Sequence, residues 1–141
     1  MTYDDFEVGF KGSYCKPVTS EDNALFGEIS GDLNPIHFQD AVAKKLGFER
    51  RISNGFVTES RIAAALVENF GSDETVVLAL EKNTRFLHPV YMDDEITATV
   101  EVIGKIDALR ALKIRAACFN QDRRQVVATT MVIKLLAIPD E

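Results

Sequence analysis

The chain has 141 residues, a mass of 15.7 kDa and 46% apolar residues, which suits a single domain over residues 1–141 and is too short for two ordinary domains. Sixteen basic and twenty-two acidic side chains give a net charge of −6, so the overall field repels polyanions and argues against a nucleic-acid partner. The longest apolar runs, residues 62–67 and 76–80, are far shorter than the roughly 20 residues that span a bilayer, so we expect no membrane partner.

The first half of the chain carries helical patterns separated by turn residues. A strand is expected over residues 12–18, and Thr19 to Asp22 has the spacing of a capping box that begins a helix. Gly31 ends this helix, and a second short helix over residues 41–46 stops at the next glycine. Four apolar residues form the expected buried face of the first helix: Ala24, Leu25, Phe26 and Ile29.

Residues 56–70 carry the most informative helical pattern. Three residues form its apolar stripe: Ile62, Leu66 and Phe70. Neighbouring alanines and a valine extend the apolar surface around both sides, which predicts an almost wholly buried helix. Gly71 is a natural end for it, and either Ser53 or Asn54 can cap its start.

Beyond this helix the apolar period becomes two, which is typical of half-buried antiparallel strands. Residues 96–102 and 112–118 alternate in this way, and two longer strands are expected over residues 76–87 and 126–138. Polar turns are expected at three places: residues 92–94, near Gly104, and residues 120–123. A sheet with one apolar face needs a cover, which the apolar helix supplies. The prediction is an α+β hot-dog domain, an antiparallel sheet wrapped around one central helix.

Several remaining features bear on the cellular setting and on metals. The acidic first residues lack the basic start and apolar stretch of a secretory signal, which indicates a cytoplasmic protein. Cys15 and Cys118 are too few for a disulfide framework and are interpreted as small buried hydrophobic residues. With only His37 and His88 as imidazoles, we expect no metal site.

Two segments could carry chemistry. In the first, a turn at Asn34 and Pro35 can fold the loop so that Asp32 and His37 share one water, which the imidazole deprotonates and the carboxylate orients. The alternative is that Asp32 satisfies loop amides and His37 is an ordinary half-buried histidine. In the second, the Gly55 amide at a helix N-terminus could polarise a thioester carbonyl; the alternative is a plain helix start.

Together these segments resemble the MaoC-like (R)-specific enoyl-CoA hydratases over nearly the whole chain. Four elements carry the resemblance: Gly31, Asp32, Asn34, Pro35 and His37; then Phe48, Glu49 and Arg50 near Ile52; then Gly55 before the apolar helix; then residues 85–91 followed by Asp93 and Asp94. The resemblance departs at two positions. Asn54 stands where the family usually has histidine, and Ala63 stands where many members have serine.

The resemblance implies a hydro-lyase that reversibly hydrates trans-2-enoyl-CoA to (R)-3-hydroxyacyl-CoA without a cofactor. Asp32 and His37 would activate the water, and the Gly55 amide would bind the thioester oxygen. Substrate contacts are assigned to four residues: Asn34, Asn54, Phe56 and Arg51. The substrate would be a CoA or acyl-carrier-protein thioester. The protein would be a homodimer or higher homo-oligomer whose sheets join edge to edge. Five cations lie in the right half of the chain for phosphates: Lys44, Lys45, Arg50, Arg51 and Arg61.

Two other functions remain open from the sequence. A hot-dog acyl-CoA thioesterase would use a carboxylate on the central helix, and Glu59 is placed to activate water there, although a first-turn acid also favours the helix dipole. A non-catalytic acyl-thioester-binding module would bind ligand without turnover, with Asn54 marking the lost activity.

Overall fold

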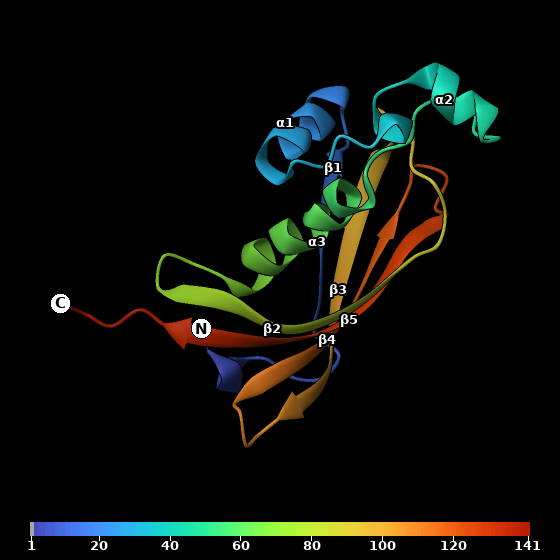
Figure 1. Cartoon of the computed structure of the whole chain (residues 1–141). Coiled ribbons are helices and arrows are strands. Elements are labelled where there is room, and N and C mark those ends of the chain that lie inside the picture. The colour runs from blue at the N-terminus through green and yellow to red at the C-terminus, as the bar shows by residue number, and fades with distance from the viewer. Residues whose placement is uncertain (1) are drawn as a thin grey trace.

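The computed structural model describes residues 2–141, in which one five-stranded antiparallel sheet curves around a long helix (Figure 1). The four elements of the first half are β1 (Lys11–Pro17), α1 (Ser20–Ser30), α2 (Asp40–Lys45) and α3 (Gly55–Phe70). The four strands of the second half are β2 (Thr75–Phe86), β3 (Glu95–Ile106), β4 (Ala111–Phe119) and β5 (Gln125–Ala137). Two 3-10 helices span Tyr3–Asp5 and Pro35–His37. The predicted hot-dog architecture is confirmed.

The sheet has the strand order β1-β3-β4-β5-β2, so β1 and β2 are its edges. The turn predicted near Gly104 is wrong, because this glycine lies inside β3 at a register shift opposite β4. The strand continues to Ile106, and the chain reverses over residues 107–110, where Arg110 adopts a positive φ of 49°. A glycine in a strand pattern thus marks a bulge here and not a turn.

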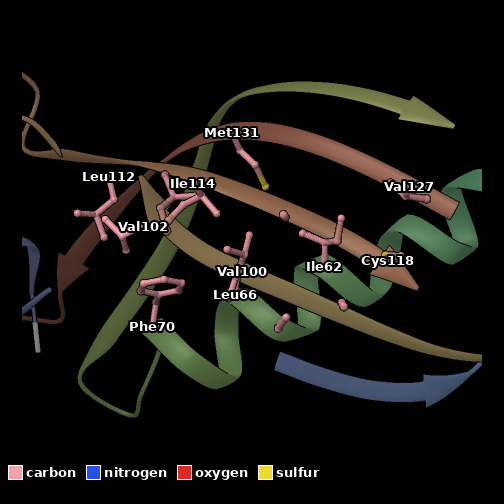
Figure 2. Close-up of a cluster of buried hydrophobic side chains, with 14 of the residues drawn as sticks. Ile62, Leu66, Phe70, Val100, Val102, Leu112, Ile114, Cys118, Val127 and Met131 are labelled. Carbon is pink, nitrogen blue, oxygen red and sulfur yellow. The ribbon is translucent and has the colours of Figure 1, made fainter. Parts of the chain in front are cut away.

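The predicted stripe on α3 forms the centre of the hydrophobic core (Figure 2). Ile62, Leu66 and Phe70 are buried and face the concave side of the sheet, where Val100 and Ile114 are also buried. Asn54 is the N-cap of the helix, and its side chain accepts the Phe56 N–H, while Gly71 is the C-cap. Burial of this one face therefore fixes the position of both helix ends relative to the sheet.

The predictions that α3 is almost wholly buried and that the apolar face of α1 is buried are wrong, because only one side of each helix packs against the rest of the chain. On α3 the sides of the stripe are open, with Phe56 57% and Val67 61% exposed. On α1 most of the predicted apolar face is turned outward, with Leu25 56% and Ile29 87% exposed, whereas Phe26 is partly buried and packs against the core. The residues of α1 that are buried are instead Asn23 and Gly27, since a small residue and a hydrogen-bonded amide permit close contact.

The two cysteines differ in environment. Cys118 is buried as predicted, and burial raises the pKa of its thiol to about 12. The prediction is wrong for Cys15, which is exposed because the alternation of the edge strand β1 turns its side chain away from the core.

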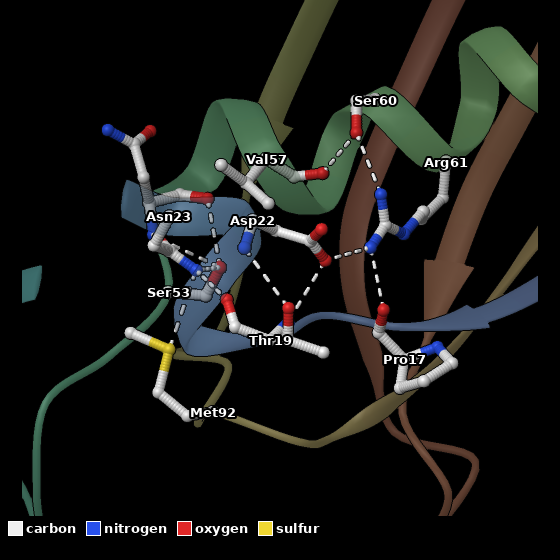
Figure 3. A network of polar contacts seen from close by, with 10 residues as sticks. Pro17, Thr19, Asp22, Asn23, Ser53, Val57, Ser60, Arg61 and Met92 are labelled. Atoms are coloured by element: carbon white, nitrogen blue, oxygen red, sulfur yellow. Dashed lines mark hydrogen bonds and ion pairs between the residues drawn. The ribbon is translucent and has the colours of Figure 1, made fainter. Parts of the chain in front are cut away.

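A polar network attaches α1 to α3 (Figure 3). The predicted capping box is present, with Thr19 accepting the Asp22 amide and Asp22 accepting the Thr19 amide. Arg61 of α3 donates to the Asp22 carboxylate at 2.7 Å and to the Pro17 carbonyl at 2.6 Å. Arg61 is 8% exposed, so the prediction that it could meet a substrate phosphate is wrong. No helix within residues 2–141 is long and apolar enough to cross a membrane.

The core assignment predicts a large stability difference between two aliphatic truncations. Ile62→Ala should lower the free energy of unfolding by about 2–5 kcal/mol, because Ile62 is fully buried between α3 and the sheet. Leu109→Ala, in the exposed turn after β3, is the control and should change it by less than about 0.5 kcal/mol. Equal effects of the two changes in urea denaturation would contradict this packing.

Candidate active site

A cavity of about 510 Å³ opens at the N-terminal end of α3. Its wall combines the loop after α1, the approach to α3, the segment after β2 and the start of β5. Six of the seven predicted site residues line it: Asp32, Asn34, His37, Asn54, Gly55 and Phe56. The seventh, Arg51, lies outside the lining, where its guanidinium is 3.5 Å from the Asp40 carboxylate.

The position of Asp32 follows from the end of α1. Gly31 adopts a left-handed conformation with φ 79°, which stops the helix and turns the chain toward α3. The Asp32 carboxylate accepts the Asn34 N–H at 3.2 Å and the Asn54 side-chain N–H at 2.9 Å. The hydrogen bond from Asn34 lowers the pKa of Asp32 most, and the bond from Asn54 and the charge of His37 lower it further. Desolvation acts in the opposite direction but is weaker, so the pKa of Asp32 lies below its usual value. Asp32 is therefore an ionised acceptor at neutral pH.

His37 is held by a hydrogen bond that defines its tautomer. Its Nδ1 lies 2.9 Å from the Ile52 carbonyl oxygen, and since a carbonyl can only accept, Nδ1 carries the hydrogen. In the neutral ring Nε2 then has a free lone pair and can accept a proton. The Ile52 N–H in turn donates to the Ile36 carbonyl, which ties the short 3-10 helix to the segment before α3.

Gly55 supplies a backbone donor at the start of α3. Asn54 caps the Phe56 amide, and the Val57 and Thr58 amides donate to the Asn54 carbonyl. Within residues 2–141 the Gly55 N–H has no hydrogen-bond partner, and it lies where the helix dipole favours negative charge. A Cβ at Gly55 would lie 2.7 Å from the Phe86 ring, so a side chain here would displace this wall of the cavity.

Glu59 faces a different direction from these groups. Its carboxylate lies 2.6 Å from Lys82 Nζ on β2, and the residue is absent from the cavity lining. Two other cavity residues were not predicted as site residues. His88 accepts from Arg124 at 2.9 Å at the rim, and Thr58 contributes a buried hydroxyl. In the sequence Thr58 is a candidate hydroxyl near the site or simply a small residue in the first turns of the buried helix, whereas no sequence signal pointed to Arg124.

The arrangement brings three chemical capacities to one cavity. Asp32 is an ionised acceptor, His37 has a basic ring nitrogen, and Gly55 has a backbone donor that no other residue of the described range 2–141 occupies. A water held by the first two could be deprotonated, and an oxyanion could be stabilised by the third. Within residues 2–141 no three His, Cys, Asp or Glu side chains are grouped as a metal site would require.

Comparison with known proteins agrees with this geometry. Residues 6–122 match the family described as MaoC like domain. The chain is 32% identical over 118 residues to 3-hydroxybutyryl-CoA dehydratase of Methylorubrum extorquens, covering 84% of this chain and 74% of that protein. It is 29% identical over 135 residues to (R)-specific enoyl-CoA hydratase of Aeromonas caviae, covering 96% and 99%. The unliganded structure of R-hydratase PhaJ1 from Pseudomonas aeruginosa matches with a TM-score of 0.83 and 29% identity, covering 99% and 91%.

The chain therefore belongs to the MaoC-like family of hot-dog proteins. Its relatives are named hydratases and dehydratases, and the protein is accordingly a hydro-lyase of this family.

The hydroxyl of Thr58 generates a stability prediction. Within residues 2–141 its Oγ1 is buried without a hydrogen-bond partner, so Thr58→Val should raise the free energy of unfolding by about 1 kcal/mol. Thr129→Val is the matched control, because the Thr129 hydroxyl donates to the Asn83 carbonyl at 2.8 Å. That change should lower stability by about 1 kcal/mol. Thermal and urea unfolding would measure the change in the free energy of unfolding for both variants. A change of the same sign in Thr58→Val and Thr129→Val would contradict the prediction.

Proposed function

We propose that the protein is an (R)-specific 2-enoyl thioester hydratase, which reversibly adds water to a trans-2-enoyl-CoA and gives an (R)-3-hydroxyacyl-CoA. The observation that supports this most directly is the convergence of Asp32, His37 and the Gly55 amide on one cavity. The name of the Aeromonas caviae relative supports the substrate and the stereochemistry. An acyl-carrier-protein thioester has the same reacting group, and a plant relative is named for that carrier.

The proposed reaction assigns one role to each group. Asp32 and His37 hold the water, and His37 Nε2 takes its proton as the oxygen bonds to C3 of the enoyl group. The electron pair of the double bond moves toward the thioester oxygen, whose negative charge the Gly55 N–H stabilises. The proton then passes to C2, which restores the thioester carbonyl. The proton is taken from the water and given to C2 on the same side of the cavity, so the addition is syn. All atoms and electrons of this reaction come from water and the enoyl thioester, so it needs neither a metal nor a redox cofactor.

The thioesterase alternative has less support. It requires the Glu59 carboxylate near the thioester carbonyl, but this group pairs with Lys82 and lies outside the cavity lining. A binding module without turnover predicts ligand affinity alone, and the activity assay separates it from a hydratase.

Replacing either proton-handling group should abolish most turnover. Asp32→Asn and His37→Ala should each lower kcat at least about 100-fold with trans-2-butenoyl-CoA, because each removes a group that activates the water. Loss of the conjugated enoyl absorbance measures hydration, and a thiol reagent measures thioester cleavage in parallel. Asp73→Asn, in the exposed turn before β2, is the control and should leave kcat unchanged.

Three outcomes would contradict the proposal. Undiminished turnover in Asp32→Asn would remove this residue from the mechanism. Thiol release that depends on Glu59 would identify a thioesterase. Substrate binding without absorbance loss in the unaltered protein would identify a binding module.

We further propose that the protein forms a homodimer through the edge strand β2. Along this strand four large apolar side chains are at least 41% exposed: Val76, Leu78, Leu80 and Phe86. An apolar edge strand with unpaired backbone groups is a template for pairing with a second copy. Such pairing would place the partner beside Phe86, which stands at the end of β2 and lines the cavity.

If the protein is a homodimer, sedimentation equilibrium should give a mass of about twice 15.7 kDa. Leu80→Lys should shift the mass toward the monomer, because it puts a charge on the exposed apolar edge. Leu109→Lys changes an equally exposed leucine in the turn after β3 and should leave the mass unchanged. A monomeric mass for the unaltered protein at micromolar concentration would refute the dimer.

A further inference from the structure

Asn54 lies at the junction of three segments and is 5% exposed. Its backbone N–H donates at 2.7 Å to the side chain of Asn23 on α1, which is itself 2% exposed. Its side-chain oxygen accepts the Phe56 N–H at 2.9 Å, and its side-chain nitrogen donates to the Asp32 carboxylate at 2.9 Å. Both ends of one amide are therefore engaged, one with the helix and one with the loop.

These contacts permit only one orientation of the amide. If the side chain turned over, its oxygen would face the Asp32 carboxylate, and its NH2 group would face the Phe56 N–H. Both pairings are repulsive, because two acceptors or two donors would meet at about 2.9 Å. The bond from Asn54 to Asn23 also fixes the backbone, so the amide is a rigid bridge between Asp32 and the start of α3.

We propose that Asn54 is a positioning residue of the hydration site, which aims the Asp32 carboxylate at the water and reserves the Gly55 amide for the thioester oxygen. The inference rests on the proposed function. Asn54 achieves the second effect by occupying the neighbouring Phe56 N–H, so that within residues 2–141 the donor left without a partner at this helix start is that of Gly55, which lines the cavity. One side chain thus sets the distance between the group that holds water and the group that holds the carbonyl.

The bridge also has an electrostatic effect. Three titratable side chains line the cavity: Asp32, His37 and His88. The Asn34 amide, the Asn54 side chain and the charge of His37 together keep the pKa of Asp32 below its usual value, against the effect of desolvation. An amide does not titrate, so Asn54 donates to Asp32 at every pH at which the protein is folded. Removal of its donor should raise the pKa of Asp32.

Two substitutions separate the two ends of the amide. Serine is a favoured helix cap, so Asn54→Ser keeps an acceptor for Phe56 but is too short to reach Asp32. Asn54→Asp keeps the cap and places a second carboxylate opposite Asp32, where like charges raise the pKa of the pair. Asn69→Asp adds the same charge at the opposite end of α3 and is the matched control.

The expected results differ between the variants. Asn54→Ser should lower kcat about tenfold, the loss of one hydrogen bond to a charged group, and change KM less than about twofold. Asn54→Asp should also move the acid limb of the kcat/KM profile upward by about one pH unit or more. Titration of the ¹³C-labelled Asp32 carboxyl by NMR should show a raised pKa in both variants. Asn69→Asp should leave kcat, the profile and this pKa unchanged.

The NMR titration keeps this inference separate from the proposed function. If the unaltered protein binds the substrate without hydrating it, the proposed function fails, while a raised Asp32 pKa in Asn54→Ser would still confirm the bridge. If Asp32→Asn is inactive, unchanged kcat, acid limb and Asp32 pKa in both Asn54 variants would overturn the role of Asn54. A loss of kcat in Asn54→Ser with an unchanged Asp32 pKa would also overturn it.

Discussion

The rest of the molecule depends on the burial of one face of α3 against the curved sheet. Ile62, Leu66 and Phe70 fix the helix along the sheet, and this packing determines where its first turn lies. Gly55 is consequently held against Phe86, close enough that a Cβ would collide with the ring. The Gly55 N–H is therefore positioned by hydrophobic packing more than one helical turn away. Such packing is a rigid support for a catalytic group.

The remaining groups reach the helix start through polar contacts from α1. Arg61 pairs with Asp22 at one side, and Asn23 binds the backbone of Asn54 at the other. These bonds hold α1 although Leu25 and Ile29 stay exposed, and they place the loop with Asp32 at the cavity. The site is thus a polar junction built at the end of an apolar core, where a carboxylate, an imidazole and an amide can meet.

The apolar periodicity of the sequence did not predict which apolar side chains stay exposed. An apolar stripe shows that a helix has a face to bury, but it does not show what covers that face. For α3 the cover is the sheet, whereas Leu25 and Ile29 of α1 remain exposed in the monomer. The same holds for the edge of β2, whose apolar side chains suit a second copy of the chain.

The sequence by itself determined the order of elements, the capped ends of the helices and the loop that carries Asp32 and His37, because these depend on local patterns of turn residues and periodicity. Only the tertiary structure decided that Arg61 is committed to Asp22, that Glu59 is committed to Lys82, and that Asn54 bridges the helix to Asp32. These pairs join residues 22 to 39 positions apart, and their bonds require approach within about 3 Å. Such approach is set by how the core packs and has no signature in local sequence.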